Sequence, residues 1–267
     1  MSLVALLSAK GSPGVTTAAV ALAAAWPAGR CAVVVETDVA GGDLAPTCGL
    51  SLEPGLGSLA SAGRHGFDSA TLLSHTQLLP CGVRAVVAPP SDNETGAALD
   101  ALTPNLEAAM ASGTVDVLAD CGRFAYDDAV ETMLHLADLA VMVARPTLAG
   151  VEHVASRLRI LRSMATQVAL VLVGERSYPA AEVAEALACE VLGVLADDPR
   201  GAQSLLSPGG ISTWWLARSS LVRSARAVAG TVASRLPAAP PAASPLSLGE
   251  RMSLAGPSRL GRNGVKS

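Results

Sequence analysis

The chain has 267 residues, of which 50% are hydrophobic, 16% charged and only 3% aromatic, and its formal net charge is −4. This balance excludes an overall electrostatic attraction to nucleic acid or to anionic membranes, although it does not exclude local positively charged patches. The length allows one large domain or two, with a substantial core built from Ala, Val and Leu.

Cysteine usage and the N-terminus indicate a reducing compartment. The five cysteines are scattered, and none forms a C-x-x-C pair, so neither a disulfide framework nor a zinc site is expected. No uninterrupted apolar stretch reaches the roughly 18–20 residues of a membrane span, and the N-terminus lacks a basic segment with a cleavage site. We therefore expect a cytoplasmic protein with no stable membrane anchor.

The first 25 residues predict a strand, a glycine-containing loop and a helix. Residues 3–7 are a short apolar run typical of a buried parallel strand. Residues 10–17 read KGSPGVTT, and the alanine-rich residues 18–25 favour a helix that ends before Pro27 and Gly29. Such a loop directs backbone N–H groups and a helix N-terminus toward a phosphate.

Strands and helices alternate along the remainder of the chain. Further strands are predicted at residues 31–35, 76–79, 84–88, 115–119, 137–144, 168–173 and 191–195, and helices at 56–62, 95–110, 127–136, 151–164 and 180–188. This alternation predicts an α/β fold, a three-layer sandwich with a mostly parallel sheet and helices on both faces. Ligands of such sheets bind beyond the carboxyl ends of the strands, where Asp38, Asp120 and Asp197 are expected together with the first loop.

The C-terminal part separates into a helix and a tail. Residues 213–236 follow a Gly/Ser/Pro break and contain Trp214-Trp215 and a helix whose arginines are read as a solvated face. Residues 237–267 are rich in Pro, Ala, Ser and Gly, and we expect a disordered tail. The predicted organisation is thus one nucleotide-binding domain over residues 1–236 and a tail over 237–267.

Several motifs, in order, resemble one protein family. Residues 10–17 resemble the deviant Walker A loop of the ParA/MinD group of P-loop ATPases, whose pattern is K-G-G-x-G-K-T-T. Residues 33–38 are similar to its second strand and switch I acid, residues 115–120 to its Walker B strand, and residues 137–146 to the strand and loop that follow. Residues 41–45, GGDLA, are similar to the CpaE-like branch. The resemblance covers about residues 1–236 and implies a Rossmann-like P-loop NTPase fold.

The resemblance implies roles for individual residues toward ATP or ADP and Mg²⁺. Thr16 would bind Mg²⁺ through its hydroxyl, and Asp120 would hold the metal through water. Asp38 would orient the attacking water, and Lys10 would reach the nucleotide of the partner subunit in a dimer. The implied nucleotide-binding residues are Lys10, Gly11, Ser12, Gly14, Val15, Thr16 and Thr17.

The chain departs from the family pattern at four places. One is the base-recognition loop, which reads Gly174-Glu175-Arg176 where the family often has Asn-Arg. Val15 stands where the loop carries its in-cis lysine, and a charged hydrogen bond of that kind contributes about 1.5–3 kcal/mol. Pro13 has no N–H to donate. Glu36 replaces the usual first Asp of switch I.

Two functional hypotheses follow. In the first, nucleotide drives a homodimer that positions or recruits a partner machine for partitioning, septum placement or assembly of a Tad-type pilus or secretion system, with non-specific DNA contact left open. If ATP is hydrolysed, turnover would be slow. In the second, the chain is a non-hydrolysing scaffold that acts through protein–protein contacts. On local grounds alone, Thr16 and Thr17 could merely cap the helix, and Asp38 and Asp120 could be ordinary turn residues.

Overall fold

A twisted eight-stranded sheet forms the centre of the protein. The computed structural model describes residues 1–10, 13–175, 177–208 and 218–238. The strands are β1 (Ser2–Ser8), β2 (Ala32–Glu36), β3 (Gln77–Leu78), β4 (Arg84–Val86), β5 (Asp116–Arg123), β6 (Leu139–Ala144), β7 (Val168–Val173) and β8 (Val191–Leu195). Their order is β3-β4-β2-β5-β1-β6-β7-β8, and every pairing is parallel except that of β3 with β4.

Strand β1 lies inside the sheet because its residues are apolar on both faces. Leu3 to Leu7 are all at most 2% exposed, as expected of a strand that is covered from both sides. It pairs with β5 and β6, and β5 pairs in turn with β2. The carboxyl ends of β1, β2 and β5 therefore lie next to one another, and they carry the loop and the acidic residues singled out in the sequence.

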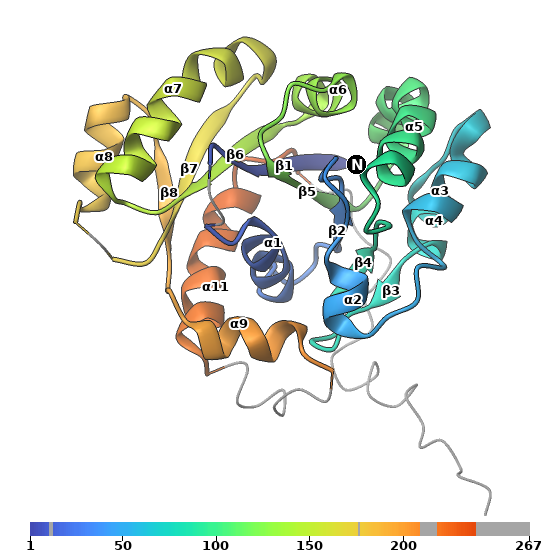
Figure 1. The fold of residues 1–267 in the computed structure, drawn as a ribbon, viewed down its shortest axis with the longest axis horizontal. Helices are drawn as coiled ribbons and strands as arrows, with labels where there is room; N and C mark the ends of the chain where they lie inside the picture. Colours follow the sequence, from blue (N-terminus) through green and yellow to red (C-terminus); the bar gives the residue numbers. More distant parts are fainter. Residues whose placement is uncertain (11–12, 176, 209–217, 239–267) are drawn as a thin grey trace, which may run out of the picture.

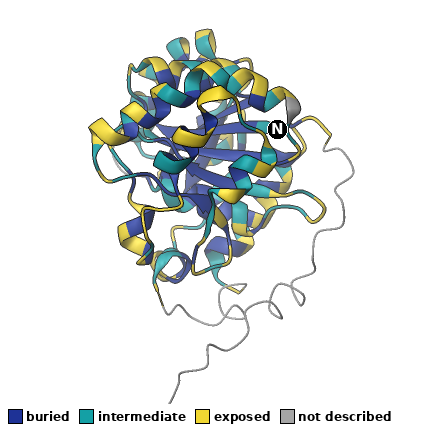
Figure 2. Ribbon diagram, turned by 90° about the vertical axis from the view of Figure 1, so that its right-hand side faces the viewer, coloured by how far each residue is buried: buried dark blue, intermediate teal, exposed yellow. Residues whose placement is uncertain are grey.

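Helices cover both faces of the sheet (Figure 1). One face carries α1 (Val15–Ala24), α2 (Leu44–Cys48), α9 (Pro199–Leu206) and α11 (Ser220–Ala233), and the other carries α3 (Leu56–Ala62), α4 (Ser69–Ser74), α5 (Asp92–Ser112), α6 (Asp128–Leu136), α7 (Leu148–Met164) and α8 (Ala180–Leu187), with a 3₁₀ turn at Gly63–His65. Each face has its own apolar cluster, and the strands are buried while the helices expose their outer sides (Figure 2). The predicted three-layer α/β sandwich is confirmed.

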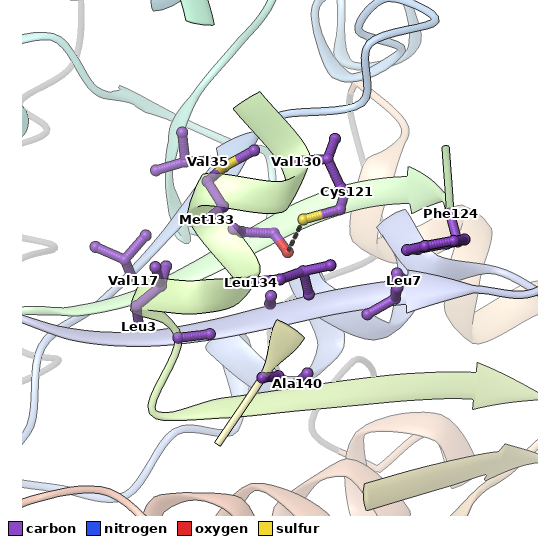
Figure 3. Packing of buried hydrophobic residues seen from close by; sticks show 14 of the residues in the cluster. Leu3, Leu7, Val35, Val117, Cys121, Phe124, Val130, Met133, Leu134 and Ala140 are labelled. Carbon is purple, nitrogen blue, oxygen red and sulfur yellow. Dashed lines mark hydrogen bonds between the residues drawn. The ribbon is translucent and has the colours of Figure 1, made fainter. Parts of the chain in front are cut away.

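Helix α6 packs on the sheet within the apolar cluster of the face that also carries α3, α5 and α7. Val130, Met133 and Leu134 of the helix belong to this cluster together with Leu3 and Leu7 of β1 (Figure 3). All five side chains are at most 5% exposed. Helix α6 therefore covers the central strand of the sheet on this face.

Most predicted elements occur with shifted ends, and three helices were missed. Strands 168–173 and 191–195 and the helix 56–62 are confirmed with the same bounds. The helix predicted from residue 18 instead begins at Val15, and β5 extends to Arg123. Helices α2, α4 and α9 were not predicted because each is only five to eight residues long and two of them contain proline.

Some expectations concern residues that the structure leaves undescribed. Residues 11–12, Trp214-Trp215 and most of the predicted tail, 239–267, lie outside the described ranges. Cys48, Cys121 and Cys189 are buried, whereas Cys31 is exposed. In the part of the chain that the structure describes, no helix combines the length and apolar character required to cross a membrane.

Candidate nucleotide-binding site

The N-terminus of α1 is open toward the carboxyl end of the sheet. The residue before the helix is Gly14, which adopts a left-handed conformation (φ 93°, ψ 48°) that favours glycine, and it makes no side-chain cap. The interpretation that Thr16 or Thr17 caps the helix is therefore wrong, because both lie within its first turn. The cap residue therefore satisfies none of the first N–H groups of α1 with a side chain, and the helix dipole favours an anionic acceptor at this end.

Thr16 is joined to the predicted Walker B acid. Its hydroxyl forms a hydrogen bond with the carboxylate of Asp120, which also accepts the backbone N–H of Gly122 at 3.1 Å. Asp120 is only 2% exposed. A threonine hydroxyl and a buried carboxylate are thus in contact beside the first turn of α1, and both are oxygen ligands of the kind that Mg²⁺ prefers.

Asp38 lies against β5 from the neighbouring strand end. Its carboxylate accepts the backbone N–H groups of Ala40, at 2.9 Å, and of Arg123. A Cβ placed on Gly122 would lie 1.6 Å from Asp38 Oδ2, so only glycine allows this approach. The structure therefore brings Asp38, Asp120 and Thr16 together at one edge of the sheet.

Both acids hold protons more tightly than ordinary aspartates. Burial raises the pKa of Asp120 to about 6, and the nearby charge of Asp38 adds to this effect. Burial also raises the pKa of Asp38, with the charge of Asp43 contributing in the same direction. A cation bound beside these two carboxylates would favour their ionised forms.

Glu36 is a site residue whose role the sequence did not reveal. It is 2% exposed, and its Oε1 accepts the N–H groups of Asp43 and Leu44 while its Oε2 accepts that of Ala88, all at 2.8 Å. The longer side chain that replaces the usual Asp thus closes the loop after β2 onto the segment after β4. The signal available in the sequence was an acidic residue at the end of a buried strand, followed by Gly41-Gly42.

Glu36 gives the stability of the chain a testable pH dependence. Burial raises its pKa from about 4.3 to about 7. Between these values the folded chain retains a proton that the unfolded chain has lost, so the free energy of unfolding falls as pH rises through this window. We expect wild type to lose roughly 1–3 kcal/mol relative to Glu36→Gln between pH 4.5 and 7.5, by urea unfolding. The exposed Glu185→Gln should follow wild type, and parallel profiles for wild type and Glu36→Gln would contradict the assignment.

A cavity of about 220 Å³ lies on the other side of the first turn. Its walls include Gly14 and Thr17, the last residue of β7, Val173, and the segments after β6 and β8. On the far wall, Arg145 Nη1 donates to Asp197 Oδ2 at 2.8 Å. Asp197 is therefore beside the first loop, as expected, but on the opposite side of it from Asp38 and Asp120.

The remaining predicted residues of the loop have distinct environments. Lys10 is exposed at the start of the loop, while Gly11 and Ser12 lie outside the described residues. Val15 is only 6% exposed and packs into the apolar cluster on the α1 face of the sheet. No group of three or more His, Cys, Asp or Glu side chains in the described ranges could hold a metal. A metal at Thr16 and Asp120 would need further ligands from a bound phosphate.

No protein-family model and no curated protein matches the sequence. The fold is nevertheless similar to several solved structures. A ParA family ATPase from Chlorobium tepidum superposes with a TM-score of 0.69 at 16% identity, covering 85% of this chain and 98% of that one. The cell division ATPase MinD of Pyrococcus furiosus gives 0.68 at 17% identity, with coverages of 87% and 98%. The septum site-determining protein MinD of Pyrococcus horikoshii, complexed with Mg-ADP, gives 0.66 at 18% identity, with coverages of 86% and 95%.

These likenesses agree with the order of motifs in the sequence. The strand order, the position of the loop after β1 and the acids after β2 and at β5 are all in place. The identities are low, so the likeness concerns the fold. The chain has the fold of the ParA/MinD-type P-loop ATPases.

Proposed function

We propose that the chain is a nucleotide-dependent switch, in which ATP and Mg²⁺ join two copies and the dimer positions or recruits a partner protein. The observation that carries the proposal is the contact between Thr16 and Asp120 beside the uncapped N-terminus of α1. A similar structure, MinD of P. horikoshii, is complexed with Mg-ADP. Partitioning, septum placement and pilus or secretion assembly remain alternative tasks for such a switch, and the proposed location is the cytoplasm.

Each residue of the cluster has a proposed task. Gly14, Val15, Thr16 and Thr17 would bind phosphate through backbone N–H groups, with Gly11 and Ser12 completing the loop. Mg²⁺ supplies a divalent charge that stabilises phosphate oxygens, and Thr16 and Asp120 would hold it there. Asp38 would accept a hydrogen bond from the attacking water. Its raised pKa makes it a better base than an ordinary aspartate, provided that it is ionised.

Lys10 gives the most direct test of the switch. It is exposed in one copy, so the proposal assigns it to the nucleotide of a second copy. We expect wild type to bind Mg-ATP with micromolar affinity by isothermal titration calorimetry and to become dimeric by light scattering. Lys10→Ala should keep Mg-ADP affinity within about twofold and weaken ATP-driven dimerisation by about tenfold, as expected for one charged contact.

The chain provides its own control for this experiment. Lys266 is its only other lysine, and Lys266→Ala should behave as wild type. A Lys10→Ala protein that dimerises normally would remove Lys10 from the interface. Failure of wild type to bind at millimolar ATP would overturn the switch.

The second candidate is a scaffold that acts through protein contacts without turnover. It is favoured by the burial of Val15, whose side chain belongs to the core and supplies no charge to a phosphate. The absence of heat on titration with ATP would support this function over the switch.

A further inference from the structure

The loop after β1 lacks a cation where bound polyphosphate would accumulate negative charge. Val15 is buried in the apolar cluster, and two carboxylates, those of Asp38 and Asp120, lie beside the first turn of α1. Phosphate oxygens placed between these groups would be repelled unless a positive side chain approached them. Among the described residues, the cations around the loop are Lys10, Arg123 and Arg145.

Two of these cations are placed less suitably. Lys10 is exposed at the beginning of the loop, five residues before Val15. The proposed function assigns it to the nucleotide of a second copy and not to that of its own subunit. Arg145 lines the cavity beside Gly14, and its guanidinium donates to the carboxylate of Asp197 at 2.8 Å. Its charge is thus already balanced, on the side of the loop away from Asp120.

Arg123 is the last residue of β5, beside the end of β1 from which the loop starts. It is in register with Ser8, the last residue of β1, and the next residue, Phe124, donates its N–H to the carbonyl oxygen of Ser8 at 2.8 Å. Cys121 and Phe124, which flank residues 122 and 123, point into the apolar cluster beneath α6 (Figure 3). Arg123 itself is exposed.

The charge of Arg123 acts on the acidic cluster. It lowers the pKa of Asp38, and the backbone N–H of Arg123 donates to the same carboxylate. Three residues earlier on the same strand, Asp120 contacts Thr16. Arg123 therefore lies at the end of the strand that carries the proposed metal ligand, next to the start of the loop and close to Asp38.

We propose that Arg123 supplies, within one subunit, the positive charge that Val15 does not, and that its guanidinium binds the β- and γ-phosphate oxygens of a bound nucleotide. The proposal rests on the proposed nucleotide-binding function and adds a phosphate-binding residue to it. A guanidinium suits this task because its planar fork of N–H donors can engage two phosphate oxygens at once.

The test compares nucleotides that differ in the number of phosphates. Isothermal titration with Mg-ADP is expected to show binding that is weaker by roughly 10- to 100-fold in Arg123→Gln than in wild type. The affinity for AMP, which lacks the β-phosphate, should differ by less than about threefold between Arg123→Gln and wild type. The exposed Arg159→Gln in α7 is the matched control and should bind both nucleotides as wild type does. Arg123→Lys should recover part of the affinity for Mg-ADP.

A second variant separates the charge from any effect on folding. Arg123→Lys keeps a positive charge at the same exposed position, so it should bind Mg-ADP more tightly than Arg123→Gln does. Equal melting temperatures of wild type and Arg123→Gln would show that the fold is retained, as expected for an exposed side chain.

The outcomes distinguish this inference from the function on which it rests. If Arg123→Gln binds Mg-ADP as well as wild type does, the role of Arg123 is overturned while nucleotide binding stands. The same holds if the substitution weakens the binding of ADP and of AMP by the same factor. If wild type binds no nucleotide at millimolar concentration, the proposed function is overturned together with the inference.

Discussion

Replacement of Asp116 by alanine is expected to lower the free energy of unfolding by about 3–5 kcal/mol, because it leaves a largely buried arginine without its partner. Asp116 is 3% exposed and forms a two-pronged ion pair with Arg30, with Nε–Oδ2 at 2.5 Å and Nη2–Oδ1 at 2.6 Å. It also accepts the indole N–H of Trp26 at 2.8 Å. The melting temperature should fall by roughly 6–20 °C for a domain of this size.

The exposed ion pair between Arg235 and Glu190 gives a matched control. Its two side chains are 41% and 50% exposed, so Glu190→Ala should change stability by less than about 1 kcal/mol. The double variant Arg30→Met with Asp116→Leu should recover part of the loss, because it leaves no unpaired charge. Equal melting temperatures for Asp116→Ala and Glu190→Ala would show that burial does not make the loss of the Arg30–Asp116 pair more costly than the loss of the exposed pair.

Gly122→Ala is expected to cost about 2–5 kcal/mol and to move Asp38 away from β5. The residue has φ +58°, where a side chain is strained by roughly 1–2 kcal/mol, and the added Cβ would overlap Asp38 Oδ2 at 1.6 Å. Gly82 also has a positive φ, +82°, but nothing lies within 4 Å of its Cβ position. Gly82→Ala should therefore show the backbone strain alone, about 1–2 kcal/mol by urea unfolding.

A second comparison assigns the difference to Asp38. In an Asp38→Gly background, Gly122→Ala should destabilise the chain no more than Gly82→Ala does, because the overlapping carboxylate is gone. If the cost of Gly122→Ala stays the same in that background, the close approach of Asp38 is not what requires glycine at this position.

The sequence predicted the layers of the fold because buried parallel strands are distinctive. The apolar runs of β7 and β8 were bounded by turn residues, and both strands were found with the expected ends. Helices such as α2 are too short to show a hydrophobic period, so tertiary packing decides them. The start of α1 was misjudged for a different reason: the helix begins at Val15, directly after Gly14, although propensity alone favoured the alanine-rich run from residue 18.

The candidate site was predicted as a set of residues but not as a network. Thr16, Asp38 and Asp120 were expected together because parallel strands share one carboxyl edge, and they lie there. The three bonds of Glu36 could not be anticipated, because its partners are backbone groups up to 52 residues away. Nor does a sequence reveal that Gly122 is needed to admit a carboxylate from another strand.

The bonds of Glu36 also restrict how the region next to Asp38 can move. Residues 36–44 are closed into a ring by the side chain of Glu36, and the ring is fastened to Ala88. A displacement that begins at Asp38 would therefore carry the start of α2 with it as one rigid piece, unless all three hydrogen bonds break. A conformational change that spreads from the carboxyl edge of the sheet through Asp38 would therefore displace residues 36–44 together and would not unwind them locally.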